Sequence, residues 1–258
     1  QPELFHHHFR SQKKHHQSYD SIIQYWQCFR IRQLTCPLGH FFTWIWVNRG
    51  KLKILGHSIV HMKSDYRISA AYLFKIKVDS KYLLIKGNRI DQYQPIGGVY
   101  KYNESFRDTY NKLQIRCESN GSFYEKNDLR VYVKGKYLTK FLTWYGSMRN
   151  REITVHREFF EEMVQTGIID KDDFFNLDFE FIRKINSGIH YSVHFKCDEI
   201  LLFDIYEVFL TQKSLESVKQ VADKNKNIIL VEYDDIEREC TEIGDKSYKI
   251  SENSKYLR

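Results

Sequence analysis

The chain has 258 residues, of which 42% are hydrophobic and 16% aromatic, and its formal net charge is +7 at pH 7. This length suits one domain with a short additional segment, and the many aromatic side chains exclude a largely disordered protein. No run in the chain approaches the roughly 18 apolar residues that cross a bilayer as a helix. The five cysteines form no CxxC pair, which favours free thiols in a reducing compartment.

The positive charge is concentrated in residues 1–62, which hold eight Lys or Arg and two Asp or Glu. Such a segment either faces something anionic, lipid headgroups or nucleic acid, or serves as a solubilising tail. Within it, the His-rich residues 1–19 are predicted to be disordered. Residues 20–35 have the pattern of an amphipathic helix that lies on a membrane surface or packs on the domain. We therefore divide the chain into a basic aromatic N-terminal segment, 1–62, and a domain, 63–258.

Apolar runs separated by turn residues follow, and this pattern predicts strands. Phe41–Val47 has the composition of a buried strand, Asn48–Gly50 of a turn, and Lys51–Met62 of a second strand. Residues 68–78 and 82–86 are predicted to form a hairpin around Asp79–Lys81. A third short segment then leads to Pro95–Gly98, where two glycines allow close backbone approach.

The remaining elements mix both types. Helices are predicted at 106–115, 137–144, 214–223, 234–239 and 250–257, and strands at 128–133, 201–210 and 228–233. A turn is expected at Asn120–Gly121, a basic loop at Gly146–Arg151, and a second hairpin, 179–186 with 189–197, around Ser187–Gly188. Thr154 is the predicted N-cap of the next helix.

That helix, whose core reads REFFEEMVQTGI, carries Glu158, Glu161 and Glu162 at relative positions i, i+3 and i+4. This spacing puts three carboxylates on one helix face, where like charges repel one another. A hard divalent cation such as Mg²⁺, which prefers oxygen ligands, would make the cluster favourable. The alternative is a solvated acidic face in which Arg157 pairs with Glu161. The other face is predicted to pack on the core through Phe159, Phe160, Met163 and Val164.

This stretch resembles the signature of the Nudix superfamily, GX5EX7REUXEEXGU, in which U is aliphatic. The REUXEE core is matched by Arg157, Glu158, Phe159, Glu161 and Glu162, with Phe in the aliphatic place. The resemblance implies that Glu158, Glu161 and Glu162 bind Mg²⁺ or Mn²⁺, that Glu161 and Glu162 are the catalytic candidates, and that Arg157 is structural. Gly97–Gly98 resembles the opening glycine pair, although about 58 residues separate it from Arg157. Gly146-x5-Glu152 repeats the Gly-to-Glu spacing of the signature.

A narrower resemblance includes that insertion. The runs at 67–102, 128–133, 151–169, 198–212 and 250–257 are similar to the SMODS-associated NUDIX family. This implies an α/β fold: a Nudix-like α/β/α sandwich with a mixed β-sheet, a large insertion inside the signature and a small basic N-terminal segment. Proteins of this family are effectors of CBASS-type bacterial anti-phage systems, and transmembrane helices usually precede their NUDIX domain.

The resemblance implies a sensor of a cyclic oligonucleotide messenger made by a CD-NTase, in a homo-oligomer. The expected location is cytoplasmic, with association to the inner membrane through an upstream segment or through residues 20–62. A nucleotide site needs close backbone approach, cations for phosphate and aromatic rings for base stacking. The candidates of these three kinds are Gly97, Gly98, Tyr100, Lys101, Arg130, Arg149 and Arg151. The first alternative is a metal-dependent Nudix hydrolase of a nucleoside-diphosphate-linked substrate. A second is nucleic-acid binding through the basic N-terminus.

Overall fold

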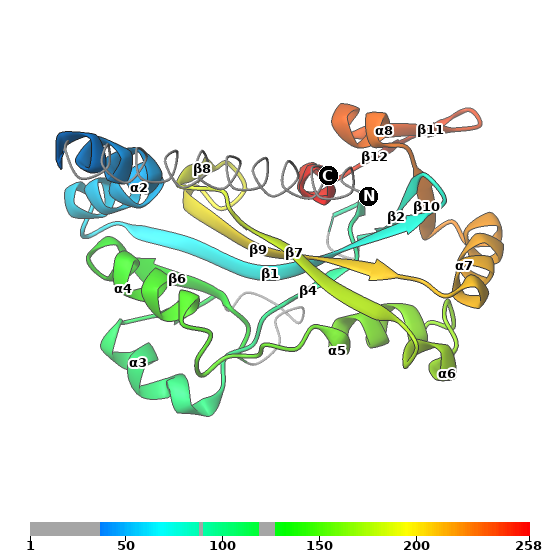
Figure 1. Ribbon diagram of the computed structural model, residues 1–258, viewed down its shortest axis with the longest axis horizontal. Coiled ribbons are helices and arrows are strands. Elements are labelled where there is room, and N and C mark those ends of the chain that lie inside the picture. Colours follow the sequence, from blue (N-terminus) through cyan, green and yellow to red (C-terminus); the bar gives the residue numbers. More distant parts are fainter. Residues whose placement is uncertain (1–36, 88–89, 119–126) are drawn as a thin grey trace, which may run out of the picture. The chain divides into compact units, whose positions relative to one another are not determined.

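The computed structural model describes residues 37–87, 90–118 and 127–258 (Figure 1). Its contacts divide the chain into two compact units, Gln1–Gly56 and His57–Arg258. The expectations for residues 1–19 and 20–35 and for the turn at Asn120–Gly121 lie outside the described residues.

Residues 37 to 60 form one helix, α2 (Pro37–Val60). The two strands predicted at Phe41–Val47 and Lys51–Met62, and the turn between them, are therefore wrong. A seven-residue apolar run has no period that separates a strand from a helix, so its type depends on its flanks. Here Pro37 occupies the first helical position, where proline is tolerated, and no other proline interrupts the segment.

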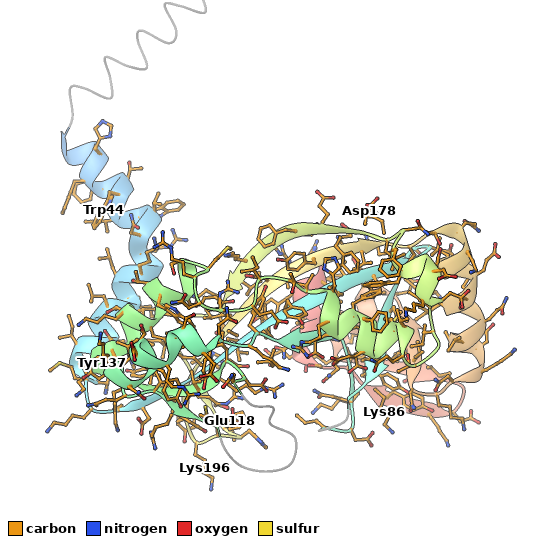
Figure 2. All side chains as sticks on the ribbon, turned by 90° about the horizontal axis from the view of Figure 1, so that it is seen from below. Trp44, Lys86, Glu118, Tyr137, Asp178 and Lys196 are labelled. Atoms are coloured by element: carbon orange, nitrogen blue, oxygen red, sulfur yellow. The ribbon has the colours of Figure 1, made fainter. Side chains whose placement is uncertain are left out.

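The aromatic side chains of α2 are exposed rather than buried. Trp46 is 66% exposed, and Figure 2 shows side chains, with Trp44 labelled, standing off more than one side of this helix. The exposed large apolar residues of the helix are Phe41, Phe42, Trp44, Trp46, Val47, Leu55, Ile59 and Val60. Among the described residues, no helix is long and apolar enough to span a membrane.

The second unit is organised around β1 (Asp65–Val78), which is buried along most of its length. One edge of β1 pairs in parallel with β9 (Cys197–Phe209), from Tyr66 opposite Asp198 to Ile76 opposite Val208. The other edge pairs antiparallel with β6 (Arg130–Lys134), β4 (Gly97–Val99) and β2 (Lys81–Lys86) in turn. A continuous apolar strand of this kind is typical of the centre of a mixed sheet with both faces covered.

Shorter strands extend the sheet on both sides. Strand β2 pairs with β3 (Tyr93–Gln94) and β10 (Ile228–Val231), and β6 pairs with β5 (Arg116–Cys117). Strand β9 pairs on its outer edge with β7 (Asp178–Asn186) and β8 (His190–Ser192). A separate two-stranded sheet joins β11 (Cys240–Ile243) to β12 (Lys246–Lys249).

One predicted hairpin is confirmed and the other is wrong. Val78 pairs with Lys81 across a two-residue loop, in which Asp79 has a φ of 55°. At Ser187–Gly188, however, the chain does not reverse, because β7 and β8 both pair with β9. The Ser187 hydroxyl accepts the Leu201 N–H at 2.9 Å and bridges the break. The reversal falls instead at residues 193–196.

Helices cover both faces of this sheet. Figure 1 shows α4, α5 and α6 on one side of β1 and β9, and α8 with the C-terminal η3 on the other. The helices that follow β4 are η1 (Glu104–Phe106), α3 (Arg107–Lys112), α4 (Gly135–Gly146), α5 (His156–Phe159), η2 (Phe160–Val164), α6 (Lys171–Phe174), α7 (Gln212–Lys224), α8 (Tyr233–Arg238) and η3 (Glu252–Leu257). The predicted α/β fold with a mixed sheet is thus confirmed.

Candidate functional site

The glutamates lie on a helix that changes its geometry midway. Four α-helical residues of α5 lead into the π-helix η2, where Gln165 donates to the Phe160 carbonyl at 2.9 Å, five residues back. Such π-turns are frequent at functional sites. The predicted Thr154 N-cap is wrong, because the helix begins at His156 after Val155 without a side-chain cap.

The apolar side of this helix is anchored in the aromatic core, as predicted. Of the four residues predicted to pack on the core, Phe159 and Met163 are fully buried, whereas Phe160 and Val164 are half-buried. The ring of Phe159 meets those of Phe74 and Phe179 edge-on, with centroids 5.3 and 5.0 Å apart. Edge-to-face aromatic pairs contribute about 0.5–1.5 kcal/mol each beyond their buried area. The core thus fixes the helix that carries the glutamates.

Arg157 links the carboxylates of this region. Its Nε lies 3.2 Å from Glu152, and its Nη1 lies 2.5 Å from Glu158 and 3.6 Å from Glu161. A second bond joins Nη2 to Glu152 at 3.4 Å. The Arg157–Glu161 pair expected of a solvated acidic face is therefore present. The nitrogen atoms of the Arg157 guanidinium are therefore directed at the carboxylates of this site.

The glycine pair lies directly against this helix. A Cβ built at Gly98 would stand 1.9 Å from Cγ of Glu158. Strand β4 holds both glycines beside β1, with Gly98 opposite Tyr72. Burial, and then the charges of Glu152 and Glu158, raise the pKa of the Tyr72 hydroxyl. Two segments about 60 residues apart in the sequence thus meet at one site, as the resemblance implied.

An open groove of about 600 Å³ lies beside these residues. Its two walls are joined through the backbone: Glu152 donates to the Lys101 carbonyl at 2.7 Å, and Asn103 donates to the Asn150 carbonyl at 2.9 Å. The groove is lined by Lys101, Tyr102, Asn103, Glu104, Asn127, Arg151, Glu152, Ile153, Thr154 and Arg157. Both cationic and anionic side chains therefore face the same opening.

The family model of the SMODS-associated NUDIX domain matches residues 65–258, which is more than half of the chain. The protein belongs to the SMODS-associated NUDIX family. No curated protein and no solved structure shows a detectable match. The family match covers the whole of β1 and everything after it, including the segment inserted between Gly98 and Arg157. The predicted boundary between residues 62 and 63 stays a prediction.

The predicted nucleotide-binding residues of the NUDIX domain differ in their surroundings. Lys101 and Arg151 line the groove. Tyr100 is 1% exposed and donates to Asp204 at 2.8 Å, so its ring has no face open to a ligand here. Arg130 forms an ion pair with Asp128, and Arg149 is an exposed loop residue that is not among the groove lining. Their roles in binding stay predictions.

Glu152 belongs to the site, although the sequence did not predict it as a site residue. It accepts from Arg157 and from the Lys101 N–H, the latter at 3.4 Å. Its signal in the sequence was the Gly146-x5-Glu152 spacing, which repeats that of the signature. Because only four residues separate Glu152 from Arg157, the match to the signature is incomplete.

Nudix domains generally use divalent metals, and the carboxylate oxygens present are of the right chemistry. In the part of the chain that the structure describes, however, no three His, Cys, Asp or Glu side chains come close enough to hold an ion. Two of the three predicted ligands, Glu158 and Glu161, contact Arg157 instead. As placed, these residues do not fit the metal, and metal binding by the glutamates stays a prediction.

Glu162 gives a pH-dependent prediction. Burial, and then the charge of Glu161, raise its pKa above the ordinary 4.5. A carboxyl with a raised folded-state pKa stabilises the fold fully only below its unfolded pKa, and this is lost as the pH rises through the folded pKa. Glu162→Gln should therefore stabilise the protein at pH 7, by about 0.5 kcal/mol or less because the group is partly solvated. Urea unfolding in EDTA at pH 7 and pH 4 tests this. A gain that does not shrink at pH 4 would contradict it.

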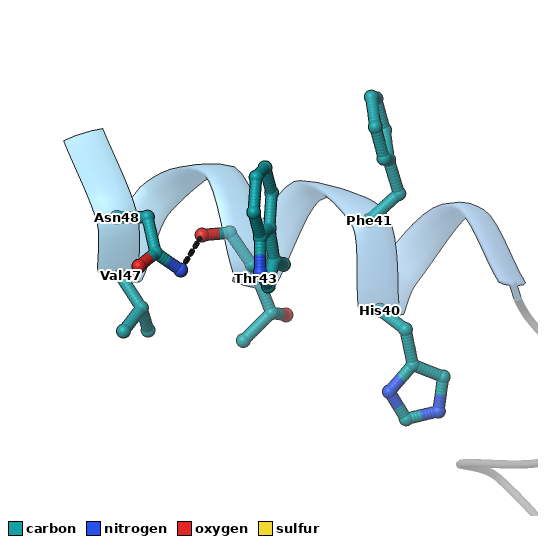
Figure 3. Close-up of a pocket in the computed structure, with 6 residues that line it drawn as sticks. His40, Phe41, Thr43, Val47 and Asn48 are labelled. Atoms are coloured by element: carbon teal, nitrogen blue, oxygen red, sulfur yellow. Dashed lines mark hydrogen bonds between the residues drawn. The ribbon is translucent and has the colours of Figure 1, made fainter. Parts of the chain in front are cut away.

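A second hollow, of about 620 Å³, lies on α2 and is not a candidate active site. All its lining residues belong to this one helix, and Figure 3 shows Phe41 and His40 projecting on opposite sides of it. The Asn48 amide donates to the Trp44 carbonyl at 2.9 Å, within the helix itself. A single helix cannot enclose a small ligand, so this hollow only marks an exposed apolar surface.

Proposed function

We propose that this NUDIX domain is the nucleotide-binding sensor of a bacterial antiviral, CBASS-type effector, and that it recognises a cyclic oligonucleotide made by a CD-NTase. The observation that supports this best is the groove, whose lining includes Lys101 and Arg151 and which adjoins the glutamate helix. Cationic side chains suit phosphate oxygens. An open groove of about 600 Å³ also has the volume of a small-molecule site.

The arrangement of the glutamates favours binding over turnover. A metal-dependent hydrolase needs Glu158, Glu161 and Glu162 to converge on one cation. Here Arg157 contacts the first two, which leaves no convergent set among the described residues. A messenger that has to persist in order to signal would also be a poor substrate for a fast hydrolase. Hydrolysis of a nucleoside-diphosphate linkage is therefore the second candidate.

Calorimetry with a panel of cyclic di- and trinucleotides tests the sensor. We expect at least one of them to bind with a Kd of about 1 μM or tighter, with and without Mg²⁺. Glu161→Gln and Glu162→Gln should leave this affinity within about threefold, because their carboxylates are not needed for a metal. Absence of binding across the panel, together with Mg²⁺-dependent phosphate release from nucleoside diphosphate derivatives that either variant abolishes, would establish the hydrolase instead. Light scattering with and without the messenger tests the expected homo-oligomer.

We also propose that α2 contacts an anionic lipid surface. The helix has no Asp or Glu between Pro37 and Val60, and it carries Arg49, Lys51 and Lys53 after its exposed aromatic run. Exposed tryptophans suit the membrane interface, and basic residues are attracted to anionic headgroups.

Cosedimentation with vesicles tests this proposal. The protein should bind vesicles that contain phosphatidylserine and should bind neutral ones much more weakly. Lys51→Gln with Lys53→Gln should weaken binding by about tenfold or more, since each basic residue near the surface contributes about 1 kcal/mol. The matched control, Lys219→Gln on α7, should have no effect. Equal binding to neutral vesicles, or none to either, would contradict it.

A further inference from the structure

Two arginines line the groove, and their surroundings are opposite. Arg157 directs Nε, Nη1 and Nη2 at three carboxylates, those of Glu152, Glu158 and Glu161. An anion that approached it would have to displace them. Arg151 forms no ion pair with any carboxylate of the described residues, although it is only 4% exposed. The two side chains therefore cannot play the same part toward a ligand.

The guanidinium of Arg151 is held in a fixed plane. Its carbon lies 4.5 Å from the ring centroid of Tyr100 and 4.4 Å from that of Tyr145. Its Nε donates to the Tyr145 carbonyl at 3.3 Å, and its Nη1 donates to the Glu152 carbonyl at 2.9 Å. The buried Asp204 accepts from Tyr100 instead. Aromatic rings and neutral carbonyls thus surround a full positive charge.

This environment has a physical consequence. A charged group taken out of water is costly unless it is paired, and carbonyl oxygens compensate only part of that cost. The Tyr100 and Tyr145 ring centroids lie 6.4 Å apart, too close for the rings to stand on opposite sides of the guanidinium, so they cover it from two adjacent sides and leave the side of Nη2 open to an anion. Arg151 contributes to the lining of the groove, and no described residue accepts from its Nη2. The planar fork of an arginine edge matches two oxygens of one phosphate.

We propose that Arg151 is the phosphate-binding residue of this groove, and that the Tyr100 and Tyr145 rings, together with the two backbone carbonyls, hold its guanidinium in place so that one phosphate group binds at its free edge. This inference rests on the proposed function, because it takes the bound phosphate to be part of a nucleotide. The phosphate is either the diester of a cyclic oligonucleotide or a terminal phosphate, and both present the oxygens that the fork requires.

Arg151→Lys tests the proposal, with Arg238→Lys on α8 as the control. Lysine keeps the charge but not the fork, so Arg151→Lys should weaken both inorganic pyrophosphate and the cyclic nucleotide by at least tenfold. Arg238 is exposed and outside the groove lining, so its variant should stay within twofold of wild type. Equal effects of the two variants, or no effect of Arg151→Lys, would overturn the proposal.

A second measurement needs no variant and so does not depend on folding of Arg151→Lys. Crystals of the wild-type protein soaked in tungstate, a phosphate mimic, should show an anomalous peak at hydrogen-bond distance from the Arg151 guanidinium. Peaks only at surface lysines, or no peak, would overturn the assignment.

The two probes separate this proposal from the proposed function. If pyrophosphate and tungstate bind at Arg151 and no cyclic oligonucleotide does, the phosphate site stands and the cyclic messenger is wrong. If the cyclic nucleotide binds and neither pyrophosphate nor Arg151→Lys behaves as expected, the sensor stands and the assignment of Arg151 is wrong.

Discussion

Arg67→Met is expected to lower the free energy of unfolding by about 3–5 kcal/mol, which is the usual cost of removing one partner from a buried ion network. Arg67 lies on β1, is 3% exposed and forms ion pairs with Glu118, at 2.7 Å, and with Glu199. Its guanidinium also lies 3.7 Å from the ring centroid of Phe195. The methionine would remove the Arg67 cation from two buried carboxylates, of which Glu199 also lies 3.5 Å from His190. Urea unfolding followed by circular dichroism measures the loss.

The control for this variant lies on β5, which β6 separates from β1 in the sheet. Arg116 also pairs with an acidic residue, Asp65, but its side chain is 60% exposed. Arg116→Met should therefore cost less than about 1 kcal/mol. Similar losses for the two variants would mean that burial of the Arg67 network contributes nothing, and the description of the β1 core would be wrong.

The second large effect is expected at the glycine pair. A Cβ at Gly97 would stand 2.2 Å from the Tyr72 carbonyl oxygen, which belongs to the backbone of the central strand. A strand that is paired on both edges cannot move away, so Gly97→Ala should cost about 3 kcal/mol or more. At Gly98 the three atoms nearest to the Cβ all belong to the side chain of Glu158; rotation removes its Cγ and Cδ, whereas its Cβ, at 2.9 Å, requires a small shift of the helix. Gly98→Ala should therefore cost less than Gly97→Ala, about 1–2 kcal/mol.

The two alanine variants thus distinguish an effect on the stability of the fold from an effect on ligand binding at the site. Gly98→Ala should keep the fold but displace Glu158 from β4, so it reports on ligand binding, whereas Gly97→Ala should report on folding alone. Gly146→Ala is the control, because nothing lies within 4 Å of a Cβ placed there. Thermal unfolding and calorimetry on the three variants measure this. If Gly97→Ala proves as stable as Gly146→Ala, the close approach of β4 to β1 is wrong.

Local signals were sufficient where each residue's partners are near it in the chain. The hairpin at Asp79–Lys81 formed where a two-residue loop joins two apolar runs, and the apolar face of the glutamate helix packed as its period predicted. The same reasoning was wrong at Phe41–Val47, because a short apolar run is compatible with either a strand or a helix. It was also wrong at Ser187–Gly188, where pairing with β9 overrode a good turn sequence.

In the candidate site, too, local signals identified some features, whereas others depended on the tertiary structure. The matched REUXEE core pointed to the glutamates, Gly97–Gly98 resembled the glycine pair that opens the signature, and the structure brings Gly98 against Glu158. The sequence indicated the Arg157–Glu161 pair as an alternative, but it could not tell that Arg157 would also bind Glu152 and Glu158, since that depends on side-chain conformations about a π-turn.

By itself, the sequence determined the family, the α/β class and the helix that carries the glutamates, because each is encoded in local composition and spacing. Only the tertiary structure decided which cations face a ligand. Arg149 and Arg151 are equivalent in the sequence, yet one is exposed and the other is buried against two tyrosines. Burial and ring contacts arise from segments distant in the chain, so they distinguish residues that the sequence pattern cannot.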